Sequence, residues 1–228
     1  MQKLTLKDNE LPYEVEEELK SLRTNLQLCG DDKRVILVTS CFANEGKSTT
    51  TRELARSLTA LGKNVLLIDT DLRKSVVKEQ VESGTIGMGL THYLIRRCPA
   101  ADAIYSTNIS GLYLMPAGAL PPNPSELLSS QRMAELLDRA RETYDYVLVD
   151  SAPLGMVTDA AIVAQHCDGA VLLIEARSVQ RRLAQEVLQK LQNTQCPVLG
   201  VVLNKVDRRQ DKYYSYGRYE KYYGNSKD

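Results

Sequence analysis

Three features of the sequence predict an α/β fold, with a doubly wound and mostly parallel sheet flanked by helices. The first is a set of short runs of consecutive apolar residues, which is typical of strands buried on both faces. The second is the helical periodicity of the segments between these runs, because strands that alternate with helices form βαβ units. The third is a glycine-containing loop that joins the first of these strands to a helix, at the strand end where such folds bind ligands. The strand-like runs are residues 35–39, 65–68, 146–149, 170–174 and 198–203.

The expected helices follow from apolar periodicity. After the strand at 35–39, a helix is expected to end at Gly62, and its apolar face consists of Leu54, Ala55, Leu58 and Leu61. Two further helices are expected at 133–143 and 179–193. Near the N-terminus, residues 12–28 are expected to form a charged helix with a narrow apolar stripe, which consists of Val15, Leu19, Leu22 and Leu26.

The composition divides the chain into three parts. Residues 33–206 carry the strand and helix pattern and form the expected core, while residues 1–32 form an N-terminal helical arm. Residues 207–228 contain no aliphatic residue, so they cannot build a core and are expected to form a flexible tail. This tail holds six of the twelve tyrosines in the chain, namely Tyr213, Tyr214, Tyr216, Tyr219, Tyr222 and Tyr223.

Charge and composition exclude several classes of protein. The 29 basic residues balance the 29 acidic ones, so the whole chain has no net field that would draw it onto nucleic acid or anionic lipid. No apolar run reaches the ~18 residues of a membrane span, and the N-terminus lacks a signal-peptide core, which predicts a cytoplasmic protein. Five scattered cysteines indicate reduced thiols rather than a disulfide framework, and His92 and His166 make a poor zinc site.

The loop after the first strand carries the strongest chemical signal. Residues 40–50 read S-C-F-A-N-E-G-K-S-T-T and contain the G-K-[ST] end of a Walker A loop between a strand and a helix. The free N–H groups and dipole of the helix start would cradle a triphosphate. Lys47 would reach the β and γ phosphates, and the Ser48 hydroxyl would coordinate Mg²⁺.

Carboxylates follow two other strands at the same edge of the predicted sheet. Asp69 and Asp71 come directly after the strand at 65–68, with Arg73 beyond them. Asp150 ends the strand at 146–149 in a Walker B pattern and would hold Mg²⁺ directly or through water. The sequence therefore predicts a Mg²⁺-nucleotide site at this edge.

These motifs resemble those of a known family, the bacterial tyrosine kinases of the CpsD/CapB type within the P-loop NTPase superfamily. The resemblance covers nearly the whole chain: residues 40–49 resemble its Walker A, 69–74 its second aspartate motif, and 144–153 its Walker B. Residues 115–118 and 121–128 resemble two further signatures that are less common in other P-loop proteins, and the tyrosine-rich tail is similar too.

The resemblance implies an ATP- and Mg²⁺-dependent kinase that phosphorylates the tail tyrosines of a neighbouring copy. The catalytic set it implies is Lys47, Asp69, Asp71 and Asp150, and the Mg²⁺ ligands are Ser48, Asp69 and Asp150. Asp69 or Asp71 would accept the tyrosine proton, and the two roles are not separated. The nucleotide-binding residues are Ala43, Asn44, Glu45, Gly46, Lys47, Ser48, Thr49, Arg73, which would steady phosphate or nearby carboxylates, and Asn204, which would contact the base.

The resemblance also implies partners. In relatives a motif E-x-x-R-x-x-R packs subunits into rings, and here its positions are Glu17, Lys20 and Arg23, on a flank of the helix away from the apolar stripe. Lys20 replaces an arginine and loses its planar fork. Further implied partners are a transmembrane activator with a cytoplasmic segment that recruits the kinase to the inner face of the membrane, protein substrates in capsular or exopolysaccharide synthesis, and a cognate tyrosine phosphatase.

Ala43 and Asn44 depart from the family, which usually has proline and glycine there. Asparagine is among the non-glycine residues that best tolerate a left-handed backbone, so the loop can still close around phosphate.

Three rival interpretations stay open. A MinD/ParA-type ATPase shares the fold but has an additional lysine near the start of the loop, where this chain has Ser40, Cys41 and Phe42, and it has no use for the tail tyrosines. A GTPase is suggested by N-K-x-D at 204–207, but Asp150 lacks the following D-x-x-G glycine. A nucleic-acid binder is suggested by basic residues among the tail tyrosines, although acidic residues dilute that charge.

Overall fold

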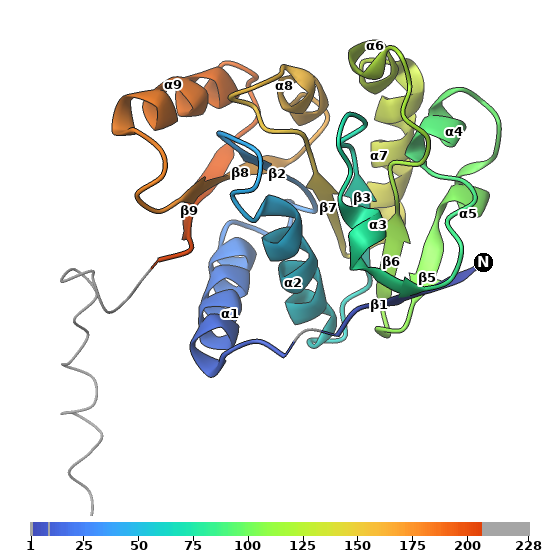
Figure 1. The fold of residues 1–228 in the computed structure, drawn as a ribbon, viewed down its shortest axis with the longest axis horizontal. Coiled ribbons are helices and arrows are strands. Elements are labelled where there is room, and N and C mark those ends of the chain that lie inside the picture. Colours follow the sequence, from blue (N-terminus) through green and yellow to red (C-terminus); the bar gives the residue numbers. More distant parts are fainter. Residues whose placement is uncertain (1, 9, 207–228) are drawn as a thin grey trace, which may run out of the picture.

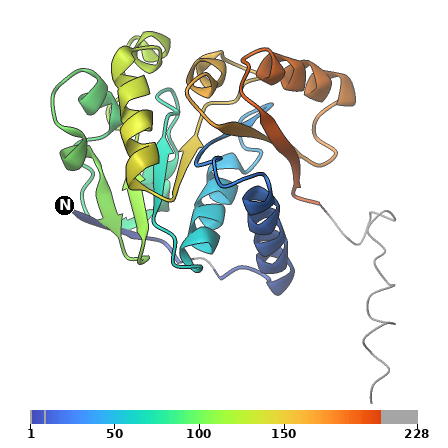
Figure 2. The same cartoon turned by 180° about the vertical axis from the view of Figure 1, so that it is seen from behind.

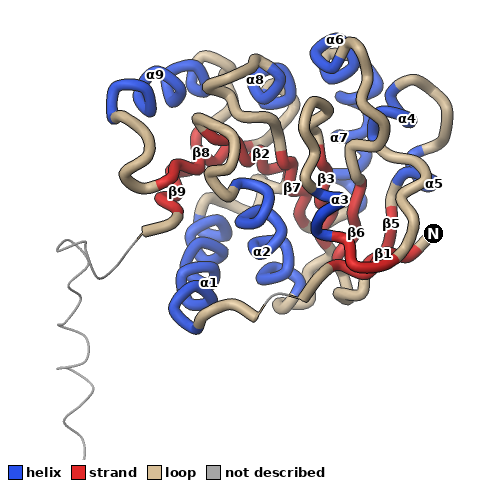
Figure 3. The backbone as a smooth tube through the Cα atoms, in the orientation of Figure 1, coloured by secondary structure: helices blue, strands red, loops and turns tan. Residues whose placement is uncertain are grey.

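The computed structural model describes residues 2–8 and 10–206 of the chain. These residues form a single mixed sheet with helices on both faces (Figure 1, Figure 3). In chain order the strands and helices are β1 (Lys3–Leu6), α1 (Tyr13–Leu28), β2 (Val35–Ser40), α2 (Lys47–Thr59), β3 (Val65–Asp69), α3 (Val77–Gln80), β4 (Val81–Ser83), α4 (Leu90–Leu94), α5 (Ala100–Ala103), β5 (Tyr105–Thr107), β6 (Leu112–Met115), α6 (Pro124–Leu128), α7 (Gln131–Thr143), β7 (Tyr146–Asp150), α8 (Asp159–Ala164), β8 (Gly169–Glu175), α9 (Arg181–Gln192) and β9 (Val198–Asn204).

The strand order places the predicted motifs next to one another. Within the described residues the sheet has nine strands in the order β4-β1-β5-β6-β3-β7-β2-β8-β9. The pairs β2/β7, β2/β8, β3/β6, β3/β7, β8/β9 and β1/β5 are parallel, while β1/β4 and β5/β6 are antiparallel. Because β7 lies between β2 and β3, the ends of these three strands meet at one edge of the sheet. The predicted fold class is confirmed.

Two apolar cores cover the two faces of the sheet. On β3, Val65 and Leu67 belong to the core under α1 and α2, while Leu66 and Ile68 belong to the core under α7, α8 and α9. This alternation follows from the period of two along a strand. Figures 1 and 2 show α1 and α2 on one face and α7, α8 and α9 on the other. None of the helices that the structure describes is long and apolar enough to cross a membrane.

The structure adds short strands that the sequence analysis did not predict. β1 joins the sheet within the segment expected to be a helical arm, with Leu4 and Leu6 fully buried. β9 was predicted, but its burial was not predicted correctly. It is an edge strand, and Val201 and Leu203 are about half exposed, at 50% and 49%. The expectation that this strand is buried on both faces is therefore wrong.

Candidate active site

The loop between β2 and α2 bends through two left-handed backbone positions. Asn44 has φ 66° and Gly46 has φ 91°. Asparagine tolerates this conformation better than most residues, as the sequence analysis expected for Asn44. At Gly46 a side chain would also meet a neighbour, because an added Cβ would lie 2.3 Å from Asn204 Nδ2. Glycine is thus required at this position for both conformation and space.

Groups at the ends of β8 and β9 hold the loop in this shape. Asn204 Nδ2 donates to the Glu45 carbonyl at 2.8 Å, and Lys205 Nζ donates to the Asn44 carbonyl at 2.7 Å. The buried Glu45 carboxylate accepts hydrogen bonds from the backbone N–H groups of Phe42 at 2.7 Å and Glu175 at 3.0 Å. Asn204 was predicted to contact a nucleotide base, but in the structure its side-chain amide donates to the loop backbone. The bracing by Glu45 and Lys205 was not predicted.

The backbone N–H groups of residues 43–49 are available to a ligand. None of them donates to an acceptor among the residues that the structure describes, whereas the next N–H group, that of Thr50, bonds to the Gly46 carbonyl at 2.9 Å. Because the helix dipole adds positive potential at the start of α2, this set of donors favours an anion. The residues present therefore fit a polyphosphate, and Ala43, Glu45 and Thr49 contribute through their backbone.

Lys47 and Asp150 form a buried ion pair beside the loop. Lys47 Nζ lies 2.5 Å from Asp150 Oδ1, and the two side chains are only 8% and 3% exposed. Lys47 Nζ also lies 3.3 Å from Ser48 Oγ. Each charge offsets part of the cost of burying the other, which either would bear if alone. The predicted residues Lys47, Ser48 and Asp150 are thus brought together.

Asp69 lies opposite Asp150 across the β3/β7 pair and is also buried. Its Oδ1 accepts the N–H of Asp71 at 3.0 Å, and its Oδ2 accepts a hydrogen bond from the Ser75 hydroxyl. Burial, together with the negative charge of Asp150, raises the pKa of Asp69 to about 7. Burial also raises the pKa of Asp150, although Lys47 opposes this shift. One edge of the sheet therefore holds two carboxyls with elevated pKa values.

Asp71 has different surroundings from Asp69. It is half-buried, and its Oδ1 accepts the backbone N–H groups of Arg73 at 3.2 Å and Lys74 at 2.9 Å. These bonds fix the turn that follows β3. The side chain of Asp71 therefore stabilises the loop that follows β3, and besides burial its negative charge also contributes to the raised pKa of Asp150.

Arg73 binds a carboxylate that the sequence analysis did not single out. Its Nε and Nη2 atoms lie 2.7 and 3.0 Å from the two carboxylate oxygens of Asp159, and Nη2 lies 2.9 Å from Ser125 Oγ. Burial alone would raise the pKa of Asp159, but the bonds from Arg73 and Ser125 hold it below its ordinary value. The sequence analysis expected Arg73 to steady phosphate or nearby carboxylates, and in the structure its partner is the carboxylate of Asp159. Asp159 starts α8 without any motif that would reveal it.

The predicted oligomer contacts lie on α1, away from the loop. Lys20 pairs with Glu17 at 2.7 Å on an exposed surface. Arg23 instead turns inward, and its Nη1 donates to the Ser57 carbonyl on α2 at 2.8 Å. The expectation that all three residues lie on an outward flank is wrong for Arg23. The tyrosines at 213–223, predicted as phosphoacceptors, lie outside the described residues.

Comparison with known proteins places the chain in a family. The model of a family described as AAA domain matches residues 33–198. Tyrosine-protein kinase CpsD of Streptococcus agalactiae is 37% identical over 224 residues, which cover 97% of each chain. The chain belongs to the CpsD tyrosine-protein kinase family. The kinase domain of Escherichia coli tyrosine kinase ETK superposes with a TM-score of 0.82 at 28% identity, over 92% of this chain and 86% of that one.

Membership of the CpsD family confirms the resemblance and the enzyme class that the sequence analysis expected. The MinD protein of Pyrococcus horikoshii, solved with Mg-ADP, superposes with a TM-score of 0.67 over 77% of this chain and 71% of that one. At 24% identity it shows the shared fold alone.

Proposed function

We propose that this chain is an ATP-dependent protein-tyrosine autokinase that phosphorylates the tyrosines of residues 207–228 in a neighbouring copy. The observation that carries the proposal is the junction of three elements at one sheet edge: a loop with unbonded N–H groups, the buried Lys47–Asp150 pair, and Asp69 with a pKa of about 7. Phosphoryl transfer needs positioned charge and a base, and these residues supply both.

The loop and Lys47 are proposed to hold the phosphates of ATP. The N–H groups of residues 43–49 would donate to phosphate oxygens, and Lys47 would exchange its bond with Asp150 for one with the transferred phosphate. When bound, Mg²⁺ neutralises the charge that develops on the phosphate oxygens. Ser48, Asp69 and Asp150 would hold it, and their hydroxyl and carboxylate oxygens fit its preference.

Asp69 is the proposed general base. A phenol with pKa ≈ 10 is a weak nucleophile at neutral pH until its proton is accepted. A base that titrates near pH 7 is well matched to this task. Asp69 has that pKa before Mg²⁺ binds, whereas Asp71 is engaged in the turn after β3. We therefore propose Asp69 as the base and Asp71 as the residue that positions its loop.

Family membership supports a proposal for the wider setting. We propose residues 1–32 as an oligomer contact, 33–206 as the catalytic core and 207–228 as the substrate segment. We further propose a homo-oligomeric ring, a separate transmembrane activator that brings the kinase to the inner face of the membrane, and a role in capsular or exopolysaccharide synthesis. A cognate phosphatase would reset the tyrosines.

The test is peptide mapping of the full chain by mass spectrometry after incubation with Mg-ATP or Mg-GTP, with and without the cytoplasmic segment of an activator. We expect ATP-dependent phosphate on residues 213–223, and none in a Lys47→Met variant. Asp69→Asn is expected to lower the rate at least 100-fold while nucleotide still binds. Nucleotide hydrolysis without tyrosine modification would overturn the proposal and favour a MinD-type switch, and a preference for GTP would favour a GTPase.

A further inference from the structure

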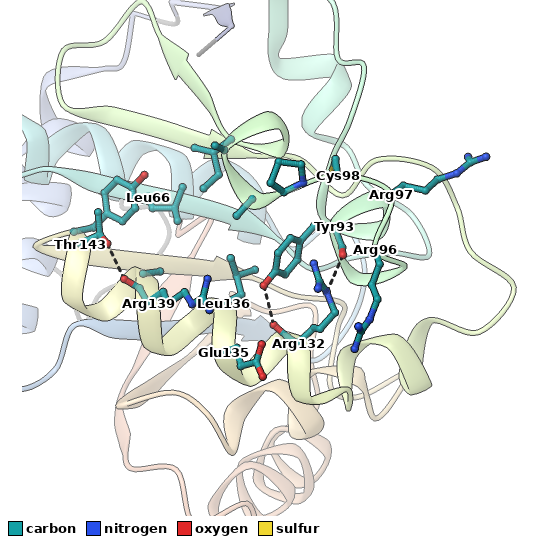
Figure 4. A pocket seen from close by; sticks show the side chains of 16 residues that line it. Leu66, Tyr93, Arg96, Arg97, Cys98, Arg132, Glu135, Leu136, Arg139 and Thr143 are labelled. Atoms are coloured by element: carbon teal, nitrogen blue, oxygen red, sulfur yellow. Dashed lines mark hydrogen bonds between the residues drawn. The ribbon is translucent and has the colours of Figure 1, made fainter.

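A cavity lies away from the nucleotide loop, between the α4–α5 segment and α7. Its volume is about 690 Å³, within the ~300–1,000 Å³ typical of sites for small ligands. Arg96, Arg97, Arg132 and Arg139 line it, whereas Glu135 is the one acidic residue in its lining. None of the loop residues 40–50 takes part. Figure 4 shows Arg96 and Arg132 side by side, with Arg139 farther along α7, while Arg97 points away from the group.

The arginines of this cavity have no acidic partner among the residues that the structure describes. Elsewhere, Arg56, Arg73 and Arg141 each bind an aspartate. In the cavity, Arg132 stacks on the Tyr93 ring at 4.3 Å and its Nε donates to the Tyr93 carbonyl at 3.1 Å, so its two terminal nitrogens stay available. The side chains of Arg96 and Arg139 form no ion pair with any described residue.

The backbone at Arg96 shows that an arginine is held here at a cost. Arg96 N–H bonds to the Tyr93 carbonyl at 3.0 Å, and Arg97 N–H bonds to the His92 carbonyl at 2.8 Å. These two bonds form a Schellman motif at the end of α4, with Arg96 at the position that usually holds glycine. Arg96 has φ 63°, which is strained for a residue with a Cβ. The chain thus places a guanidinium where folding alone would favour glycine.

Apolar side chains form the rest of the wall. Leu66 and Leu136 are buried at the cavity, and Ile104 and Pro99 extend the apolar surface. Guanidinium groups match phosphate in bidentate geometry, and an apolar wall beside them suits an aromatic ring. A ligand that carries both a phosphate and an aromatic ring is an aryl phosphate, and in proteins this group occurs as phosphotyrosine.

We propose that this cavity binds phosphotyrosine from residues 207–228 of the same chain. The inference rests on the proposed function for the supply of that phosphate. Twenty-two residues reach at most ~75 Å when fully extended, whereas nine strands span roughly 40 Å, so the segment after β9 is long enough to reach the far end of the sheet. Docking would withdraw a phosphorylated tyrosine from the nucleotide site, which frees that site for the next one.

The test measures binding of labelled peptides to the full chain by fluorescence anisotropy. The probes span residues 211–223, six with one phosphotyrosine each and one without phosphate. The protein carries Lys47→Met, so that its own tail stays unmodified. We expect at least one phosphopeptide to bind tenfold or more tightly than the unmodified peptide. If none does, or if inorganic phosphate competes as well as the phosphopeptide, the proposal is overturned.

Three variants locate the site. Arg139→Gln and Arg96→Gly are expected to weaken phosphopeptide binding at least fivefold. Arg96→Gly should also keep or raise the melting temperature, because glycine suits its backbone, so weaker binding could not be blamed on misfolding. Arg181→Gln on α9, another exposed arginine, is the matched control and should bind within twofold of the parent. Binding unchanged in both cavity variants would overturn the proposal.

The synthetic peptides separate this inference from the proposed function. They carry phosphate already, so their binding does not depend on the activity of the chain. If the chain modifies no tyrosine but the phosphopeptides bind through Arg96 and Arg139, the autokinase proposal fails and the docking site stands.

Discussion

Burial gives Asp69 two properties. It raises the pKa of the carboxyl to a value suited to a base, and it makes the ionised form costly in the folded chain. The carboxyl of Asp69 retains its proton in the folded chain up to about pH 7, while in the unfolded chain it loses the proton near the ordinary value of 3.8. Between these values the folded state binds more protons than the unfolded state. The free energy of unfolding that depends on Asp69 therefore decreases as pH rises through this window.

Replacing Asp69 should expose this linkage. Asp69→Asn removes the titration, so the stability of the variant relative to the parent should increase by about 2 to 3 kcal/mol between pH 5 and pH 8. Urea unfolding of both proteins at the two pH values measures the difference. A constant difference between parent and Asp69→Asn would show that Asp69 titrates normally.

Gly46 illustrates a residue fixed by both conformation and space. In Gly46→Ala the new Cβ meets Asn204 Nδ2 and the backbone must keep φ 91°, so we expect the loop to shift and nucleotide affinity to fall at least tenfold. Fluorescent ATP titration measures the affinity. Adding Asn204→Ala removes the collision but not the strained φ, so it should recover only part of the loss. Parent-like affinity in Gly46→Ala would contradict this account of the loop.

Arg23 joins α1 to α2. Its guanidinium reaches the backbone and hydroxyl of Ser57, and Leu26 on the same helix is buried. The ammonium group of Lys20, one turn earlier, pairs with Glu17 on the exposed surface. The two basic residues of one charged flank therefore have different roles within the fold.

Substitutions on this flank should separate those roles. Arg23→Gln is expected to lower the free energy of unfolding by about 1 to 2 kcal/mol, because it removes a charged donor to Ser57. Lys20→Gln, the matched control, should leave the unfolding transition unchanged, since exposed pairs contribute little. Denaturant unfolding measures both. Equal effects of the two substitutions would show that the bond to Ser57 adds nothing to the free energy of unfolding. Sedimentation of the same variants tests the proposed ring contact.

The elements that sequence alone could predict are those with a strong local signal. Long apolar runs and the G-K-S motif place β2, β3, β7 and the loop correctly, because these strands are buried on both faces. β1 has only four residues and depends on partners at 81–83 and 105–107, so its strand is a tertiary effect. The Arg73–Asp159 pair joins residues 86 positions apart, and no local pattern encodes it. The bond between the Glu45 carboxylate and the N–H group of Glu175, 130 positions away, is equally non-local.

In the molecule as a whole, the sheet order brings together the residues that are proposed to be catalytic. β2, β3 and β7 are neighbours, so Lys47, Asp69 and Asp150 meet at one edge. The segment 207–228 follows β9, at the end of the sheet. The proposed catalytic residues and the tail tyrosines occupy separate parts of the sequence, so each set can be removed from a different copy of the chain.

Mixing two inactive copies should restore phosphorylation if transfer occurs between molecules. One copy carries Lys47→Met and keeps its tyrosines; the other keeps Lys47 but has phenylalanine at all six positions of the tail. Neither alone should gain phosphate at residues 213–223. In the mixture, the Lys47→Met copy should gain phosphate. The rate should rise with total protein concentration, because the two copies must meet. Mass spectrometry of tryptic peptides assigns the phosphate. A mixture that stays unmodified, while the parent modifies itself at a rate independent of concentration, would show that each tail enters its own nucleotide site.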